Sequence, residues 1–266
     1  MAPGDHHRLV RNGRGARSVL EVPESTPATL EPLDSETHRL APAPAAMGNV
    51  LELRAITKRW PSLEHAVLDD VDLVLEPGTV TWMEGRNGIG KTTLMRIAAG
   101  LIHPDAGEVH LDGLHPAGDR RAYQMRSALL SAGTGGLYAR LSVRWHLGWW
   151  ARLAFIEPRR RSAIVDASLE RFDLVALASR RVDRMSMGQR QRLRLAGTFL
   201  HDPKLILLDE PRNSLDAEGI AILTAAVDAA TARGAAVLWC SPTGEEEKIE
   251  SDCRLQLVRG KLVVSP

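Results

Sequence analysis

The chain has 266 residues, of which 44% are hydrophobic and 25% charged, and its 34 Lys and Arg side chains nearly balance 33 Asp and Glu. This length fits one large or two small domains, and a formal net charge of +1 gives no electrostatic basis for nucleic-acid binding. The 2 cysteines have no C-x-x-C spacing, which excludes a disulfide framework and favours a reduced, cytosolic setting. No apolar run reaches the roughly 18 residues that a membrane-spanning helix needs.

Residues 1–48 differ in composition from the rest of the chain. They contain no aromatic residue and no cysteine, but six of the 15 prolines. Such a segment buries too little apolar surface to offset the entropy of ordering it, so disorder is predicted there. Because the patterned sequence begins near Met47, a second hypothesis is that the native protein starts at Met47, which an intact-mass measurement would test.

From residue 49 onward, short β-rich runs alternate with longer helical ones. Strands are predicted at residues 51–56, 67–75, 79–83, 205–208 and 235–240, and a terminal hairpin at residues 255–258 and 262–264. The runs at 205–208 and 235–240 are continuously apolar, which is typical of parallel strands covered on both faces. Between them, residues 217–232 have helical periodicity. The alternation predicts one α/β domain over residues 49–266, built around a largely parallel sheet.

The first chemical motif is a glycine-rich loop between a predicted strand and a helical run at residues 93–99. Residues 85–92 read GRNGIGKT and satisfy the pattern G-x-x-x-x-G-K-[ST]. Glycines let the backbone approach phosphate oxygens, and the amides at the helix N-terminus supply partial positive charge. Lys91 is expected to neutralise β- and γ-phosphate charge, and the Thr92 hydroxyl to complete a Mg²⁺ shell. The predicted nucleotide ligands are Gly85, Arg86, Asn87, Gly88, Ile89, Gly90, Lys91, Thr92 and Thr93.

Two carboxylates follow the apolar run at residues 205–208. Asp209 and Glu210 stand at the C-terminal end of a predicted parallel strand, which is where α/β sheets bind ligands. Asp209 is expected to hold Mg²⁺ through water, and Glu210 to act on the attacking water as general base. A solvated strand end has the same pattern, but its pairing with a phosphate loop favours the functional interpretation.

Taken together, these motifs resemble the nucleotide-binding domains of the ATP-binding cassette (ABC) family over residues 49–266. The resemblance rests on residues 87–94, 99–101, 104–109, 208–211 and 213–216, and on a signature-like run, MSMGQRQR, at residues 185–192. It implies a P-loop NTPase fold in which an N-terminal antiparallel β part precedes the parallel sheet. It also implies a helical subdomain inserted at about residues 137–185.

The resemblance further implies that ATP, with Mg²⁺, is bound between two cassettes. Trp60 then stacks on adenine, and Asp216 belongs to the loop that runs between the subunits. The signature residues that reach the partner's ATP are Ser186, Met187, Gly188 and Gln189, at the N-terminus of a helix over residues 189–199. Ser186 is also a good N-cap for that helix, and both roles are compatible.

Three positions depart from the family's pattern. Residues 131–136 contain no Gln or Glu where the family has a glutamine loop, and Met187 replaces the first glycine of the signature. Pro242 stands where the family has a histidine, and its side chain can neither donate nor accept a hydrogen bond. We therefore expect ATP binding to be retained and hydrolysis to be slow, because losing positioned polar contacts costs on the order of 10²-fold in rate.

Two further features have simple structural interpretations. The basic run at residues 159–161 after Pro158 is typical of a solvated helix start. Trp145, Trp149 and Trp150 form a group in which Trp145 and Trp149 stand one helical turn apart. Packing in the core is the simpler interpretation of this group. The alternative is an interface, because the family docks its permease on the helical subdomain.

Three classes of function remain. With one cassette and no predicted membrane span, the chain is expected to be the ATPase subunit of an ABC transporter. Such a subunit is peripheral on the cytoplasmic face of the membrane. It forms a homo- or heterodimer with another ABC cassette and works with separately encoded permease subunits. The alternatives are a soluble ABC ATPase without a transport role and a catalytically weak nucleotide-binding partner of a second cassette. The sequence predicts neither the cargo nor the direction of transport.

Overall fold

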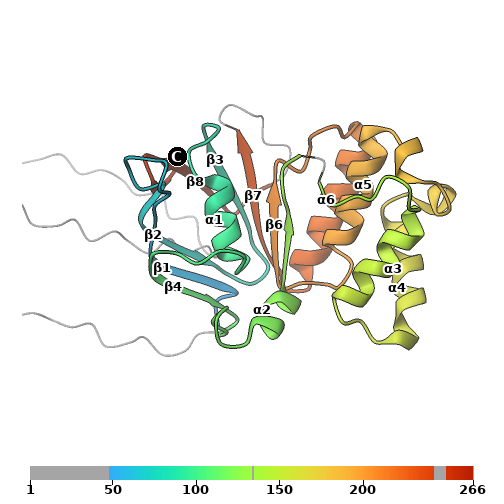
Figure 1. Ribbon diagram of the computed structural model, residues 1–266, viewed down its shortest axis with the longest axis horizontal. Coiled ribbons are helices and arrows are strands. Elements are labelled where there is room, and N and C mark those ends of the chain that lie inside the picture. Colours follow the sequence, from blue (N-terminus) through green and yellow to red (C-terminus); the bar gives the residue numbers. More distant parts are fainter. Residues whose placement is uncertain (1–47, 134, 243–249, 266) are drawn as a thin grey trace, which may run out of the picture.

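The computed structural model describes residues 48–133, 135–242 and 250–265. The predicted disorder of the N-terminal segment and the possible start at Met47 therefore lie outside the described residues. Within the described ranges, the helices fall short of the length and apolar character needed to cross a bilayer. Two sheets lie side by side, and a group of helices covers the far face of the larger one (Figure 1).

The smaller sheet is antiparallel, as the N-terminal β part was expected to be. Its strand order is β2–β1–β4, from Leu68–Leu75, Leu51–Lys58 and Ala106–Leu111. The larger sheet has the order β5–β6–β7–β3–β8–β9. Its strands are Ser127–Leu130, Leu205–Asp209, Ala236–Pro242, Val80–Gly85, Cys253–Val258 and Lys261–Val264. β9 pairs antiparallel with β8, which confirms the terminal hairpin, and the other neighbours are parallel.

The apolar run of β6 confirms that this strand is covered on both faces. Leu205 and Leu207 are fully buried among the antiparallel sheet and α1, Lys91–Ala98. Ile206 and Leu208 are fully buried among the helices on the other face. Alternate side chains of one strand therefore belong to two different cores, which is why the strand has no polar position before Asp209.

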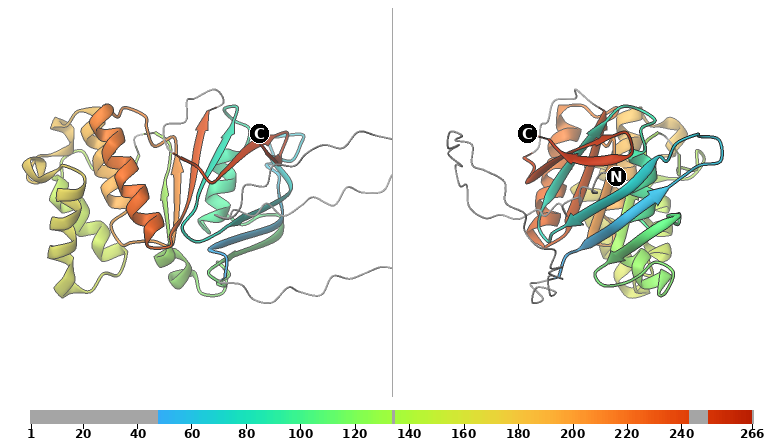
Figure 2. Two further views of the ribbon diagram at one scale, coloured as in Figure 1. Left: turned by 180° about the vertical axis from the view of Figure 1, so that it is seen from behind. Right: turned by 90° about the vertical axis from the view of Figure 1, so that its left-hand side faces the viewer.

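The helices divide between the two faces of the large sheet. α1 packs between the two sheets, and α2, Arg120–Arg126, leads into the edge strand β5 (Figure 1). On the other face α5, Met187–Thr198, and α6, Ala217–Ala232, lie next to the strands, with α3, Val143–Leu153, and α4, Pro158–Arg171, farther out (Figure 2). Two 3₁₀ turns, Val175–Leu177 and Val182–Arg184, connect α4 to α5. α6 has the predicted bounds, and α4 begins at Pro158 as expected for a helix start.

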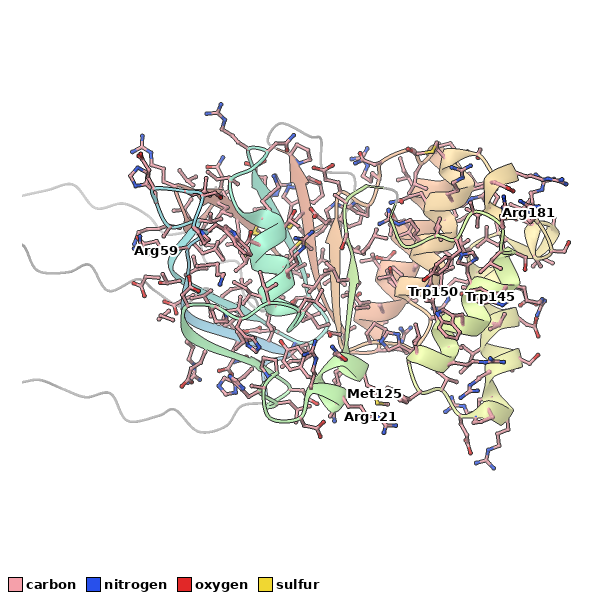
Figure 3. The ribbon with its side chains drawn as sticks, in the orientation of Figure 1. Arg59, Arg121, Met125, Trp145, Trp150 and Arg181 are labelled. Carbon is pink, nitrogen blue, oxygen red and sulfur yellow. The ribbon has the colours of Figure 1, made fainter. Side chains whose placement is uncertain are left out.

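Tryptophans form two stacked pairs in different surroundings. Trp82 and Trp239 stack inside the core with ring centroids 5.8 Å apart. Trp145 and Trp149 stack on α3 at 5.6 Å but remain 42% and 39% exposed, so the interpretation of core packing is wrong for these two residues and right for Trp150, which packs against the core. The side chain that turns inward is the neighbouring Trp150, because one residue further along a helix points about 100° away (Figure 3).

Candidate functional site

The glycine-rich loop leaves β3 and enters α1, and two of its glycines adopt backbone angles that other residues avoid. Gly88 has φ +79° and Gly90 has φ +121°. At Gly90 a Cβ would also lie 2.7 Å from Cγ1 of Val67, so no side chain fits. No described side chain caps the N-terminus of α1, so its first amides stay available to an anion.

This loop and the end of β6 line one cavity of about 280 Å³. The lining residues are Asn87, Gly88, Gly90, Lys91, Thr92, Thr93, Asp209 and Glu210. Lys91 is only 6% exposed, and its Nζ donates to the carbonyl oxygens of Gly85 at 2.5 Å and Arg86 at 3.2 Å. A buried ammonium held by two carbonyls lies beside the amides of the loop, which is a favourable place for phosphate oxygens.

A hydroxyl and a carboxylate meet at the end of the cavity where β6 stops. Thr92 Oγ1 donates to Asp209 Oδ2 at 2.8 Å, and Asp209 is 2% exposed. These residues are 117 positions apart in the chain and meet because α1 packs across β6. Hard oxygen donors of this kind are the ligands that Mg²⁺ prefers, so this pair fits a magnesium ion bound with phosphate.

Glu210 follows Asp209 in the left-handed region of backbone conformation, with φ +50°. This conformation costs a non-glycine residue about 1–3 kcal/mol and persists only where its surroundings hold it. The Glu210 N–H donates to the Cys240 carbonyl at 3.0 Å, and Asn213 Nδ2 donates to Glu210 Oε2 at 2.8 Å. The turn after β6 therefore aims the Glu210 carboxylate into the cavity.

Cys240 lies fully buried beneath these acids on β7. Burial, and then the charge of the neighbouring Asp209, raise the pKa of the Cys240 thiol well above its ordinary value. The thiol therefore stays protonated and is not a nucleophile of this site.

The helix that starts within the signature-like run, α5, begins at Met187, two residues earlier than the predicted start at residue 189. Ser186 is its N-cap, because Ser186 Oγ accepts from Gln189 N at 3.2 Å while Gln189 Oε1 accepts from Ser186 N at 3.1 Å. The N-cap interpretation of Ser186 is confirmed. Gly188 packs so closely against the next loop that a Cβ there would lie 2.8 Å from the Ser214 carbonyl oxygen.

Several predicted site residues lie away from the phosphate cavity. Asp216 caps α6 by accepting from Gly219 N at 2.8 Å. Trp60 is 36% exposed, with Lys58 Nζ 5.2 Å from its ring centroid. Ser186, Met187, Gly188, Gln189, Asp216 and Trp60 are all outside the described lining of that cavity.

Next to the phosphate cavity is a second one, of about 300 Å³, that sequence reasoning did not foresee. Its lining includes Met187, Gln191, Arg194, Asn213 and Glu210, and Glu210 lines the phosphate cavity as well. Asn213 and Gln191 belonged to quoted motifs, although no role was predicted for either side chain, whereas Arg194 carried no signal beyond membership of a helix with several arginines.

Two of the departures from the family's pattern lie at the C-terminal ends of strands of the large sheet, next to this site. Pro242 is the last residue of β7 and stands in register with Gly85 of β3. The carbonyls of Ser131 and Gly133, which follow β5, accept from the guanidinium of Arg194.

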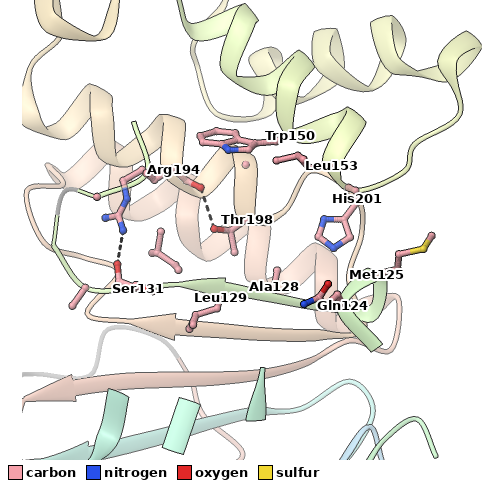
Figure 4. A pocket seen from close by; sticks show the side chains of 16 residues that line it. Gln124, Met125, Ala128, Leu129, Ser131, Trp150, Leu153, Arg194, Thr198 and His201 are labelled. Carbon is pink, nitrogen blue, oxygen red and sulfur yellow. Dashed lines mark hydrogen bonds between the residues drawn. The ribbon is translucent and has the colours of Figure 1, made fainter. Parts of the chain in front are cut away.

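A larger cleft, of about 540 Å³, separates the sheet edge from the outer helices. Trp150 and Leu153 line it from α3, Arg194 from α5, and Met125 from α2 (Figure 4). His201 borders the cleft, and burial lowers the pKa of its imidazole. The uncharged His201 imidazole and the Trp150 indole make this side of the cleft suitable for contact with an apolar segment of another protein.

Comparisons with known proteins agree on one family. The model of the ABC transporter family matches residues 68–213. The Bacillus subtilis ABC transporter ATP-binding protein NatA is 30% identical over 194 residues, which is 73% of this chain and 79% of that protein. The Streptomyces coeruleorubidus daunorubicin resistance ATP-binding protein DrrA3 is 35% identical over 76% of this chain and 63% of its own length.

Other relatives are longer than the matched region. The Fe(3+) ions import ATP-binding protein FbpC of Mannheimia succiniciproducens is 34% identical over 169 residues, which is 64% of this chain but only 47% of that protein. The chain thus spans about half the length of this iron-import relative. A solved structure described as an ATP binding subunit of an ABC transporter superimposes with a TM-score of 0.73 at 25% identity, covering 80% of this chain and 88% of that one.

Proposed function

Because this chain belongs to the ABC transporter family, we propose that it is the ATP-binding subunit of an ABC transporter. In this role it couples the binding and hydrolysis of ATP to transport through separately encoded permease subunits. One observation carries the proposal: Lys91 and other residues of the phosphate loop, the Thr92–Asp209 pair and Glu210 line a single cavity, although the predicted ligands Gly85, Arg86 and Ile89 are outside its described lining.

Binding of the nucleotide follows from the groups in that cavity. Lys91 exchanges its contacts with the Gly85 and Arg86 carbonyls for phosphate oxygens, and the amides at the start of α1 face the same charge. Thr92 and Asp209 would hold Mg²⁺, which would neutralise charge on the phosphates. Trp60 supplies a half-exposed ring for the adenine base.

Hydrolysis depends on Glu210. Its carboxylate accepts a proton from the attacking water, and the Asn213 amide keeps the carboxylate turned toward the cavity. Pro242 offers no polar side chain at the strand end beside Gly85, so the γ-phosphate and the water lose one positioning contact. We therefore expect hydrolysis to be slow.

A second cassette completes the site in this proposal. Ser186 and Gly188 lie outside their own chain's phosphate cavity, and Met187 is 47% exposed, so these residues are free to approach a partner's ATP. The loop carrying Asp216 accompanies them, because Gly188 packs on Ser214. The partner is a second copy of this chain or another cassette.

The permease is proposed to contact the outer helices. The cleft of about 540 Å³ and the exposed Trp145–Trp149 stack both lie on this half of the molecule and offer apolar surface to a partner. Contact with a permease places the chain on the cytoplasmic face of the membrane.

Pro242 and Met187 also favour a second candidate function, a catalytically weak partner of a better-equipped cassette. In such a heterodimer this chain contributes Glu210 to one site and its altered signature to the other. A full-chain preparation that binds ATP but hydrolyses it only when a second cassette is added would favour this candidate.

The proposal is tested by nucleotide binding and turnover of the purified chain. Lys91→Ala should reduce the affinity for Mg²⁺–ATP, measured by calorimetry, by at least about 10-fold, because it removes a charge-assisted contact. Lys204→Ala is the matched control, since Lys204 pairs with Asp112 on the surface. Glu210→Gln should retain binding and abolish phosphate release.

Unchanged affinity in Lys91→Ala would contradict a nucleotide site at this loop. Transport is tested separately, by co-expression with the membrane protein encoded nearest to this gene. Failure of the two to co-purify, and of that protein to stimulate turnover, would favour a soluble ATPase instead.

A further inference from the structure

Gln191 and Arg194, one turn apart on α5, connect the loop after β5 to the turn that carries Glu210. The Arg194 guanidinium donates to the carbonyl oxygens of Ser131 and Gly133. It also donates to Gln191 Oε1 at 2.9 Å. Its side chain lines both the large cleft and the second cavity beside Glu210, and Figure 4 shows it reaching toward Ser131.

Gln191 continues the connection. It is only 7% exposed, and its Nε2 donates to the Pro211 carbonyl at 2.9 Å. Pro211 directly follows Glu210, whose left-handed backbone needs support from its surroundings. Gln191 thus restrains the carbonyl of Pro211, the residue that follows Glu210, whose carboxylate faces the phosphate cavity.

Arg194 decides which way the Gln191 amide faces. A guanidinium has only donors, so the amide end that meets it must be the oxygen. The NH₂ end is then fixed toward Pro211, where a carbonyl needs a donor. Without Arg194 the amide loses the partner that fixes its orientation, and a flipped amide would bring two oxygens together at Pro211.

We propose that Arg194 is a positioning residue for ATP hydrolysis: it orients the Gln191 amide, which holds Pro211 and thereby the Glu210 carboxylate. This inference rests on the function proposed above. It assigns Arg194 no contact with ATP, so its loss should change turnover and leave nucleotide affinity alone.

The test compares variants of the full chain by steady-state phosphate release and by calorimetric ATP affinity. Arg194→Met keeps the length of the side chain and removes its donors; kcat should fall about 10- to 100-fold, the range expected for a slightly misplaced catalytic group, with affinity within about twofold of wild type. Arg192→Met is the control on the same helix, because Arg192 pairs with Asp173 and is outside the lining of both cavities. Its kcat should be unchanged.

Gln191→Glu separates positioning from folding. The new carboxylate still accepts from Arg194, so the fold keeps that contact, but it cannot donate to Pro211. Its unfolding should stay cooperative, with the melting temperature lowered by the loss of one buried hydrogen bond, while kcat falls as in Arg194→Met. Arg194→Lys, with one point-like donor group, should give an intermediate kcat.

The two proposals fail in different ways. If wild type hydrolyses ATP and Glu210→Gln stops it, but Arg194→Met matches Arg192→Met, the role of Arg194 is refuted and the proposed function stands. If Arg194→Met does not fold, wild-type kcat in Gln191→Glu or Arg194→Lys refutes it. If wild type shows no hydrolysis that depends on Glu210, both proposals fall.

Discussion

Two glycines inside helices, Gly197 on α5 and Gly148 on α3, should respond oppositely to the same substitution. A Cβ at Gly197 would lie 2.5 Å from Cε3 and 2.6 Å from Cζ3 of the Trp150 ring. A Cβ at Gly148 would have nothing within 4 Å. Replacing glycine by alanine therefore changes helix propensity at both positions and packing at only one.

The magnitudes predict the order of stability. Alanine in a helix interior is favoured over glycine by about 1 kcal/mol, so Gly148→Ala should raise the free energy of unfolding by roughly that amount. Forcing a methyl group into a packed contact costs about 1–3 kcal/mol, so Gly197→Ala should range from neutral to about 2 kcal/mol less stable than wild type. For a domain of this size, about 1 kcal/mol shifts the melting temperature by roughly 2–4 °C.

Thermal unfolding of the full chain, followed by circular dichroism, measures the difference. Gly148→Ala should melt above wild type, and Gly197→Ala below Gly148→Ala by at least about 2 °C. In a Trp150→Leu background the clash is absent, so Gly197→Ala should become stabilising. Equal melting temperatures for the two alanine variants, with Trp150 present, would refute the close packing of the ring on α5.

Three further predictions concern titration and catalysis. Burial lowers the pKa of His146 below the value of about 6.5 expected in the unfolded chain, so its contribution to stability is complete above that pH and is lost as the pH falls toward the folded pKa. His146→Gln should therefore flatten the dependence of the melting temperature on pH below about 6.5. Thr92→Val should reduce the Mg²⁺-dependent part of ATP affinity by at least about tenfold, with affinity in EDTA unchanged. Pro242→His should raise kcat, because it supplies a polar side chain at the strand end beside Gly85, and an unchanged kcat would show that hydrolysis does not need one there.

The local parts of the fold were predictable because local chemistry determines them. α6 keeps its predicted bounds, since Asp216 caps its first turn and Gly234, with φ +86°, follows its end. β6 and β7 were recognisable as buried strands from continuous apolar runs. β5 was not, because its four residues, SALL, form a strand only by pairing with β6.

Long-range contacts explain the rest. The sequence placed Lys91, Thr92, Asp209 and Glu210 in one site because two motifs of known spacing carry them. It did not indicate Arg194, whose acceptors Ser131 and Gly133 lie 63 and 61 positions away. Periodicity placed Trp145 and Trp149 on one face of α3 but could not tell whether that face turned toward the core or the solvent.

The two stacked tryptophan pairs differ in their exposure to solvent, so quenching of the intrinsic tryptophan fluorescence can distinguish them. The Trp82–Trp239 pair is buried and closed to a collisional quencher such as iodide, whereas the Trp145–Trp149 pair is open to it. Trp60 is also 36% exposed, so in a Trp60→Phe variant the quenchable share of the intrinsic emission reports on the outer helices, and the protected share on the folded sheet. A partner that covers α3 should lower the quenchable fraction of the fluorescence and raise the protected fraction. Binding of the partner can therefore be followed without a label.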